Sequence, residues 1–206
     1  MKKIRVVSLL LIVSLILISS LVVANKGVLI QSSSLSSLYF SVGNYYASQQ
    51  DWQEAQHYFE KAINENTEFK EAYHDLGIVL HKQKNDLAAF EALLQAISID
   101  DTYKKAHNSA GLLYFKQGEY DNAISHLEKA SVLDADDVQI QFDLAVSYVE
   151  RFREKESKGT IENADLADLE KGLAHYENAL ALDPHYPHAK ENAAIVESVL
   201  SYYRGN

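Results

Sequence analysis

A regular spacing of about 34 residues organises the middle of this 206-residue chain. One glycine, two alanines and one larger side chain each recur at this interval through three copies. Four aligned columns are seldom an accident, so the spacing predicts a chain built from repeated units of one length. The columns are Gly43, Gly77 and Gly111; Ala55, Ala89 and Ala123; Ala62, Ala96 and Ala130; and Tyr39, Tyr73 and His107.

Each unit resembles a tetratricopeptide repeat (TPR), a helix-turn-helix that carries an aromatic residue, a Leu-Gly pair, a tyrosine and then Ala, Phe and Ala. In the first copy the matching residues are Tyr39, Val42, Gly43, Tyr46, Ala55, Phe59 and Ala62. The second and third copies depart from this pattern only conservatively. The resemblance implies an all-α fold, a TPR α-solenoid of about four helix pairs with small residues where helices cross.

A fourth copy begins at Val138, but its second half arrives late. Gly172 follows Ala145 by 27 positions, where the matching step from Gly43 to Ala55 is 12, so the fourth copy carries an insertion of about 15 residues. We predict a lengthened hairpin that protrudes from the solenoid, each arm longer by about two turns, held together by Phe152, Leu166 and Leu169. The insertion, at residues 151–169, is either a partner-specific finger or a tolerated addition at one edge.

These observations predict the following boundaries. The repeats cover residues 36–69, 70–103, 104–137 and 138–186, and an amphipathic helix in residues 187–206 caps the solenoid.

The first part of the chain, residues 1–24, predicts a membrane anchor. From Val6 to Val23, 14 side chains are Leu, Ile or Val, the other four are serine, and none is charged. This run is just long enough to span a bilayer, and it follows the basic residues Lys2, Lys3 and Arg5, which favour a cytoplasmic N-terminus. We therefore expect a single-pass protein whose repeats lie on the extracytoplasmic side. The alternative is a cleavable signal peptide, cut after Ala24, which would give a secreted protein.

A serine-rich stretch separates this segment from the repeats. Residues 25–35 predict a flexible tether, which would hold the folded domain close to the bilayer.

Charge and composition narrow the functional classes. The net charge is −10, and because residues 1–35 carry four basic residues and no acid, the remainder carries −14. Such a surface argues against nucleic-acid binding and favours a partner with a basic or mixed surface. The absence of cysteine excludes disulfides, cysteine-ligated metals and a cysteine nucleophile.

No metal, cofactor or catalytic site is predicted. His74 and His81 are too far apart along one helix for a single ion, and the cluster of Asp183, His185 and His188 is weakly specific. No phosphate-binding glycine loop or Gly-x-Ser-x-Gly motif is present, so an enzyme is not expected.

The resemblance implies a concave groove lined by the first helix of each unit. Its usual positions fall here on Phe40, Asn44, His74, Ile78, His81, Lys105, Asn108, Leu112, Phe115, Phe142, Val146 and Val149. The same transfer also gives Lys82, Lys116 and Gln139. Many of these side chains are apolar, which suits a partner's peptide or amphipathic helix, although a tight superhelix or the chain's own tether could cover them.

Family members that grip a C-terminal carboxylate use a set of Lys, Asn and Arg side chains at defined groove positions. This chain keeps Asn44 and Lys105 but has Phe40, Asp75 and Ser109 elsewhere in the set, so that clamp is not expected.

The leading hypothesis is thus a membrane-anchored TPR adaptor or scaffold that binds other proteins, for example in the assembly of an envelope complex. A self-associating structural solenoid is the alternative, and a catalytic accessory protein that requires a bound ion is a weaker third.

Overall fold

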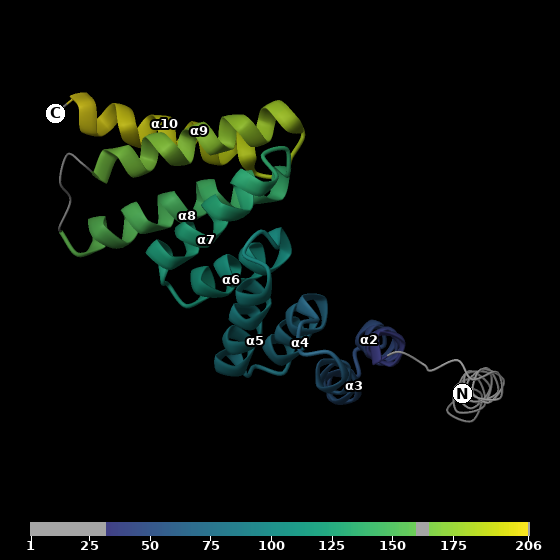
Figure 1. Cartoon of the computed structure of the whole chain (residues 1–206). Coiled ribbons are helices and arrows are strands. Elements are labelled where there is room, and N and C mark those ends of the chain that lie inside the picture. The colour runs from purple at the N-terminus through teal and green to yellow at the C-terminus, as the bar shows by residue number, and fades with distance from the viewer. Residues whose placement is uncertain (1–31, 160–164, 206) are drawn as a thin grey trace, which may run out of the picture. The chain divides into compact units, whose positions relative to one another are not determined.

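The computed structural model describes residues 32–159 and 165–205, and these ranges contain nine helices and no strand (Figure 1). Side chains are described from Leu35 onward. The helices are α2 (Ser32–Ser48), α3 (Trp52–Glu65), α4 (Lys70–Lys82), α5 (Asp86–Ile99), α6 (Lys104–Lys116), α7 (Tyr120–Leu133), α8 (Val138–Ser157), α9 (Leu166–Leu182) and α10 (Ala189–Gly205). This is an all-helical, TPR-like solenoid fold.

The chain divides into two compact units, residues 1–72 and 73–206. In the described part of the first unit, α2 packs against α3. Gly43 lies directly under the buried ring of Phe59, and the ring of Tyr46 stacks on that of Tyr58 with centroids 5.4 Å apart. A residue without a side chain at position 43 therefore sets how closely the two helices approach.

α2 begins inside the segment that the sequence predicted as a tether. Residues 32–35 are helical, and Ser36, one turn into α2, is 1% exposed. Serine has only a modest cost in a helix, and the apolar residues that follow supply a face to bury, so the serine-rich end of the predicted tether belongs to the domain.

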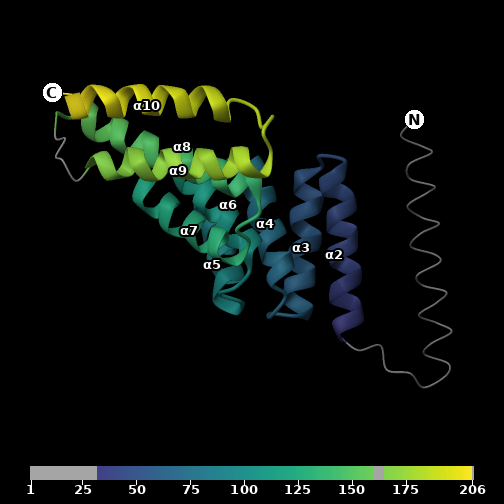
Figure 2. The same cartoon turned by 90° about the horizontal axis from the view of Figure 1, so that it is seen from above.

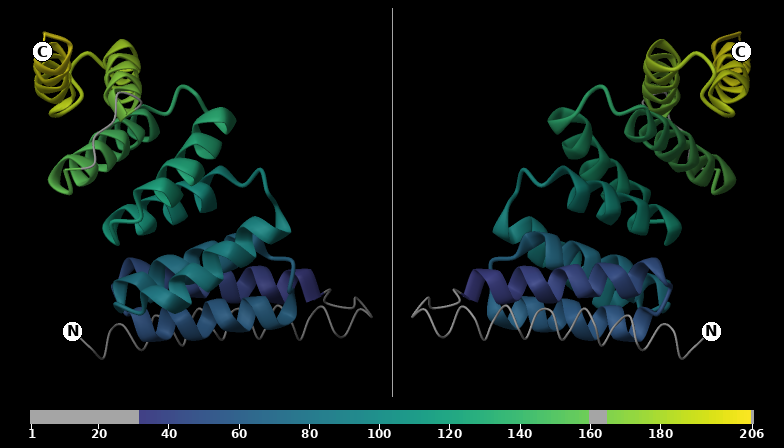
Figure 3. Two further views of the ribbon diagram at one scale, coloured as in Figure 1. Left: turned by 90° about the vertical axis from the view of Figure 1, so that its left-hand side faces the viewer. Right: turned by 90° about the vertical axis from the view of Figure 1, so that its right-hand side faces the viewer.

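In the second unit, neighbouring helices pack in chain order from α5 to α10 (Figures 1 and 2). α9 and α10 lie side by side, as the nearly end-on view in Figure 3 shows. The fully buried side chains include the repeat alanines Ala89, Ala96, Ala123 and Ala130. The small residues of the repeat pattern therefore serve helix packing, as the sequence predicted.

The turns inside the first three helix pairs share one backbone conformation. Gln50, Lys84 and Gly118 have φ values of 59°, 66° and 78°, and they occupy the same position in successive copies. This left-handed residue ends the first helix of each pair, and only the third copy has the glycine that adopts it without strain.

The fourth pair is lengthened, though unevenly. α8 has 20 residues against 13 in α4 and in α6, whereas α9 has 17 against 14 in α5 and in α7. Phe152 and Leu169 are 1% and 2% exposed, and Leu166 packs against the same cluster.

The hairpin that the sequence predicted to protrude from the solenoid has α10 packed along it. The ring of Tyr203 meets that of Phe152 with centroids 5.7 Å apart, and Leu200 is buried in the same cluster.

Ion pairs also hold the long hairpin to its neighbours. Arg151 on α8 donates from Nε and Nη2 to the two carboxylate oxygens of Asp168 on α9, at 2.9 and 2.5 Å, and from Nη1 to Asp121 on α7 at 2.7 Å. Lys155 donates to Asp165 at 2.5 Å. The charged character of the insertion, visible in the sequence, is thus largely taken up by internal pairs.

The hydrophobic run at Val6–Val23 lies outside the described residues. None of the helices within the described ranges is long and apolar enough to span a bilayer.

Candidate partner-binding surface

In the first unit the two predicted groove residues differ in their surroundings. The ring of Phe40 packs against Phe59 and Phe69, with centroids 5.7 and 4.9 Å apart, so it fills the interior of that unit. Asn44, one turn further along α2, is exposed.

Three predicted groove residues, Ile78, His81 and Leu112, line one pocket between α4 and α6. Its volume is about 170 Å³. Gly77, Leu93 and Leu113 complete its apolar wall, and Ser109, Lys82 and Lys116 supply polar groups. We call this the α4–α6 pocket.

A hydrogen-bonded chain fixes the polar side of the α4–α6 pocket. Lys116 Nζ lies 2.9 Å from His81 Nε2, and His81 Nδ1 lies 2.6 Å from Asp86 Oδ1. A lysine ammonium can only donate, so His81 accepts through Nε2 and donates its Nδ1 proton to Asp86. The Lys116 side chain is thereby held at the pocket.

His74, the next predicted residue, is part of an internal network. Its Nδ1 lies 2.7 Å from Asp75 Oδ1, its Nε2 lies 3.1 Å from Ser109 Oγ, and its ring meets Tyr103 edge-on. Of the groove residues predicted at the start of α6, Lys105 is exposed and Asn108 buries a side-chain oxygen that has no hydrogen-bond partner.

The remaining predicted aromatics, Phe115 and Phe142, are half-buried and pack against neighbouring rings. Phe115 meets the ring of Tyr120, at a centroid distance of 5.6 Å. Phe142 lies against Tyr176 and Tyr186, at 5.5 and 5.1 Å, and this covers a position that the sequence predicted to be open to a ligand.

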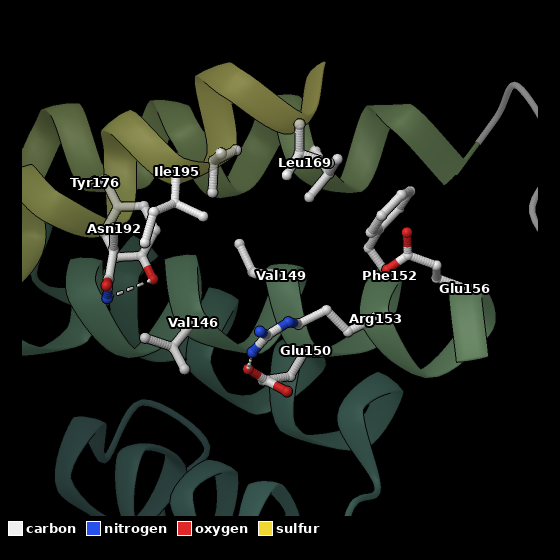
Figure 4. Close-up of a pocket in the computed structure, with 12 residues that line it drawn as sticks. Val146, Val149, Glu150, Phe152, Arg153, Glu156, Leu169, Tyr176, Asn192 and Ile195 are labelled. Carbon is white, nitrogen blue, oxygen red and sulfur yellow. Dashed lines mark hydrogen bonds and ion pairs between the residues drawn. The ribbon is translucent and has the colours of Figure 1, made fainter. Parts of the chain in front are cut away.

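Val146 and Val149 line a second pocket, of about 290 Å³, formed by α8, α9 and α10 (Figure 4). Phe152, Leu169 and Val196 extend its apolar lining. Ile195 of α10 lies on the same pocket and is 61% exposed. We call this the α8–α10 pocket.

The polar groups around the α8–α10 pocket are paired with one another. Arg153 donates to Glu150 at 2.9 Å, Asn192 donates to the Tyr176 hydroxyl at 3.2 Å, and Tyr203 donates to Glu156 at 2.7 Å. With these groups occupied, the pocket offers mainly apolar surface, which suits an aliphatic or aromatic side chain.

The α10 lining residues were missed by sequence reasoning. The sequence predicts the last helix only as an amphipathic cap, and an amphipathic pattern does not show which of its apolar side chains stays exposed, as Ile195 does. The groove transfer considered only the first helix of each unit, whereas here a helix from beyond the repeats contributes.

Burial shifts several ionisable groups near these sites. It raises the pKa of Asp143 on α8 to about 6, because the carboxyl is partly withdrawn from water and a single hydrogen bond from Gln139 opposes the effect. Burial also lowers the pKa of His107, of His126 and of His175. His107 Nδ1 lies 3.1 Å from His126 Nδ1, so at most one of these two nitrogens carries a proton.

Within residues 32–159 and 165–205, no three His, Asp or Glu side chains lie close enough together to hold a metal ion. The one hydroxyl that lines the α4–α6 pocket, that of Ser109, lies 3.1 Å from His74 Nε2, and His74 Nδ1 lies 2.7 Å from Asp75 Oδ1, so a serine, a histidine and a carboxylate are in contact at its edge.

Family models match three segments of the chain. Residues 36–69 and residues 70–103 each match a model described as a tetratricopeptide repeat, and residues 111–150 match one described as a TPR repeat. Together these segments cover just over half of the chain. A comparison with curated protein sequences finds no match.

Solved structures with the same fold include MamA from Desulfovibrio magneticus RS-1, with a TM-score of 0.66 and 17% identity over 79% of this chain and 84% of that one. PilF of Pseudomonas aeruginosa gives 0.65 and 17%, over 84% and 70%. YrrB, described as a TPR protein with an unusual peptide-binding site, gives 0.59 and 23%, over 77% and 74%. At these identities the likeness shows the fold alone.

Proposed function

This chain contains tetratricopeptide repeats, and from that premise we propose that it is a membrane-anchored adaptor that recruits other proteins by binding a peptide or helix. Proteins built from these repeats are typically non-enzymatic scaffolds, and YrrB is one that carries a peptide-binding site. The observation that carries the proposal is the presence of two apolar pockets lined by five predicted groove residues, Ile78, His81, Leu112, Val146 and Val149.

Two separate pockets of this kind can each bind one side chain of the same partner peptide or helix. Each is large enough for a single apolar side chain, and each carries a few polar groups at its edge. Binding through several small pockets gives specificity without a deep cleft.

The membrane part of the proposal rests on the sequence. The uncharged run at Val6–Val23 and the basic residues before it support an anchor that leaves the repeats on the extracytoplasmic side. An adaptor tethered in this way searches the membrane surface for its partners, which raises their effective concentration.

Photocrosslinking in cells tests the adaptor function. A photoreactive residue replaces Lys82 at the α4–α6 pocket or Ile195 at the α8–α10 pocket, and the adducts are identified by mass spectrometry. Val132, which is 86% exposed and lines neither pocket, is the matched control position. We expect a discrete partner from at least one pocket and not from Val132. Adducts that are the same at all three positions would contradict the proposal.

Self-association is a second candidate function, and one observation favours it. Ile195 and Tyr202 on α10 are 61% and 66% exposed, and because they lie two helical turns apart they share one face of the helix. Crosslinks from Ile195 only to other copies of this chain would support a structural solenoid that assembles through α10.

A further inference from the structure

The α4–α6 pocket combines basic and apolar groups in a domain that is strongly acidic. Lys82 and Lys116 lie on its edge, and Ile78, Leu93 and Leu112 line its wall. No Asp or Glu lines the pocket, although residues 36–206 carry 15 basic and 29 acidic side chains. Two lysines without nearby acids create a local positive potential on an otherwise negative surface.

The two lysines also lack an acidic partner of their own. In the described ranges Lys116 is bonded to His81 and has no salt bridge, and Lys82 has no salt bridge or hydrogen bond. Arg151 and Lys104, by contrast, pair with Asp168 and Asp134. An ammonium group in the Lys116 position, held by one hydrogen bond to His81, keeps two protons to donate elsewhere.

The repeat itself shows that this charge is local. Lys82, Lys116 and Glu150 occupy the same position in three successive copies. The α8–α10 pocket, where Glu150 lies, has Arg153 paired with Glu150 and also carries Glu156. The basic character of the α4–α6 pocket is therefore not shared by the α8–α10 pocket, whose charged groups are already paired.

We propose that the α4–α6 pocket takes a carboxylate together with an adjacent aliphatic side chain of a partner peptide. The carboxylate binds Lys82 and Lys116, and the aliphatic side chain packs on Ile78 and Leu112. This inference rests on the proposed adaptor function and names the chemistry that one of its pockets recognises. The carboxylate is that of an Asp or Glu side chain within the peptide, because Phe40, Asp75 and Ser109 replace most of the side chains with which this family grips a peptide C-terminus.

Affinity selection of synthetic peptides tests the proposal. A mixed library of dodecapeptides with free C-termini is passed over the full-length chain in lipid nanodiscs, and the retained peptides are read by mass spectrometry. The same selection is run on Lys82→Gln/Lys116→Gln, in which each variant side chain still offers N–H donors but no charge, and on Lys82→Glu/Lys116→Glu. The control, Lys129→Glu/Lys190→Glu, makes the same change in net charge at exposed sites that line neither pocket.

The expected result is that the unaltered chain and the control retain peptides in which a carboxylate adjoins Leu, Ile or Val. Both Lys82/Lys116 variants should lose this preference, and binding of a retained peptide, followed by fluorescence anisotropy, should weaken about tenfold. Replacing the Glu or Asp of a retained peptide by Gln or Asn should weaken its binding, and amidating its C-terminus should not. Loss of binding on amidation alone would contradict the side-chain carboxylate. Far-UV circular dichroism checks that the variants fold.

Two results would overturn the inference in different ways. If peptides are retained without a preference for carboxylates, or if the Lys82/Lys116 variants retain the same acidic peptides equally well, the pocket does not read a carboxylate although the adaptor function stands. If no peptide is retained by any form of the chain, peptide recognition itself is wrong and the inference fails with it.

Discussion

At the scale of single residues, the repeat glycines set the distance between paired helices. A Cβ atom added at Gly111 would lie 2.7 Å from Leu127 Cγ and 3.2 Å from the Ala123 carbonyl oxygen. Leu127 is fully buried, so its branched end has no free space into which to move.

We predict that Gly111→Ala lowers the free energy of unfolding. The overpacking costs about 1–3 kcal/mol, and the better helix propensity of alanine returns about 1 kcal/mol of it. Urea unfolding followed by circular dichroism measures the difference. Gly205→Ala, where no atom lies within 4 Å of the added Cβ, is the control and should change stability little. Equal stability of the Gly111→Ala chain would mean that the helices are not held this closely.

Asp143 is a second residue whose surroundings determine a measurable property. Asn108 and Asp143 occupy the repeat positions that His74 and Ser109 occupy one unit earlier, where the two side chains bond at 3.1 Å. In the later unit the Asn108 Oδ1 and Asp143 Oδ2 atoms are buried without a partner. A buried carboxylate oxygen that receives no hydrogen bond is costly when the carboxyl group is ionised.

The pH dependence of this cost has a definite sign. Burial raises the pKa of Asp143 from its ordinary 3.8 to about 6, so the folded state binds the proton more tightly than the unfolded state does. The contribution of Asp143 to the free energy of unfolding is therefore fully present below about pH 4 and is lost as the pH rises through about 6.

Asp143→Asn should accordingly stabilise the protein at pH 7, by about 1–3 kcal/mol, and leave it nearly unchanged at pH 4. The free energy of unfolding is measured at both values. The buried histidines titrate equally in both chains, so their contribution cancels in the comparison. Asp136→Asn removes the same charge from an exposed site and should not show this difference. A gain that is the same at pH 4 and pH 7 would exclude an ionised, poorly solvated Asp143.

At the scale of helices, the lengthened α8–α9 hairpin depends on a pair of charges that water barely reaches. The Arg151 and Asp168 side chains are 19% and 9% exposed, and the guanidinium binds both carboxylate oxygens. Removing Arg151 leaves the nearly buried Asp168 with only Lys155, 3.6 Å away, whereas removing both Arg151 and Asp168 leaves no buried carboxylate without its main partner.

Arg151→Met should therefore lower the free energy of unfolding by about 3 kcal/mol, and the double variant Arg151→Met/Asp168→Leu should recover much of the loss. Thermal or urea unfolding of the four chains of this cycle gives the coupling between the two residues. Arg204→Met, which breaks the exposed pair with Glu170, should cost no more than about 1 kcal/mol. A double variant as unstable as Arg151→Met would place the loss in packing and not in charge.

These helices show how far sequence reasoning reaches. The regular repeat spacing and the late second half of the fourth copy predict the TPR-like fold and a longer final pair, because small residues at helix crossings leave a periodic trace. The partner of Arg151 leaves no such trace. Asp168 and Asp121 lie 17 and 30 residues from Arg151, and several other acids would be equally good candidates until the helices are placed.

The candidate site was predictable to a similar degree. Groove positions transferred from the repeat include Ile78, His81 and Leu112, which do line one pocket. The transfer could not show that Phe142 is covered by Tyr186, or that α10 adds Ile195 to a pocket with Val149. Residues 187–205 lie outside the repeat pattern, so periodicity carries no information about where they pack.

At the scale of the whole molecule, charge divides the chain into a basic N-terminal segment and an acidic remainder. The basic residues Lys2, Lys3 and Arg5 precede the uncharged run at Val6–Val23, and the rest of the chain is acidic. This order is the one that the positive-inside rule associates with a cytoplasmic N-terminus and an exported C-terminal domain.

The chain has no cysteine, so a single introduced cysteine reports its location without background. Ser125 is exposed on α7 and lines neither pocket, which makes Ser125→Cys a suitable reporter. Any cell wall or outer membrane is first removed, so that the reagent reaches the outer face of the cytoplasmic membrane. We then expect a membrane-impermeant maleimide to label this cysteine as completely in intact cells as in permeabilised cells.

The same labelled protein separates an anchor from a cleaved signal. An anchored chain stays in the membrane pellet after carbonate extraction and keeps Met1 by mass spectrometry, whereas a secreted chain leaves the pellet and begins at Asn25. Deleting residues 2–24 should abolish labelling in intact cells in either case, because the domain would then remain in the cytoplasm. Labelling of Ser125→Cys only after permeabilisation would reverse the orientation, and the partners of the two pockets would then have to be sought among cytoplasmic proteins.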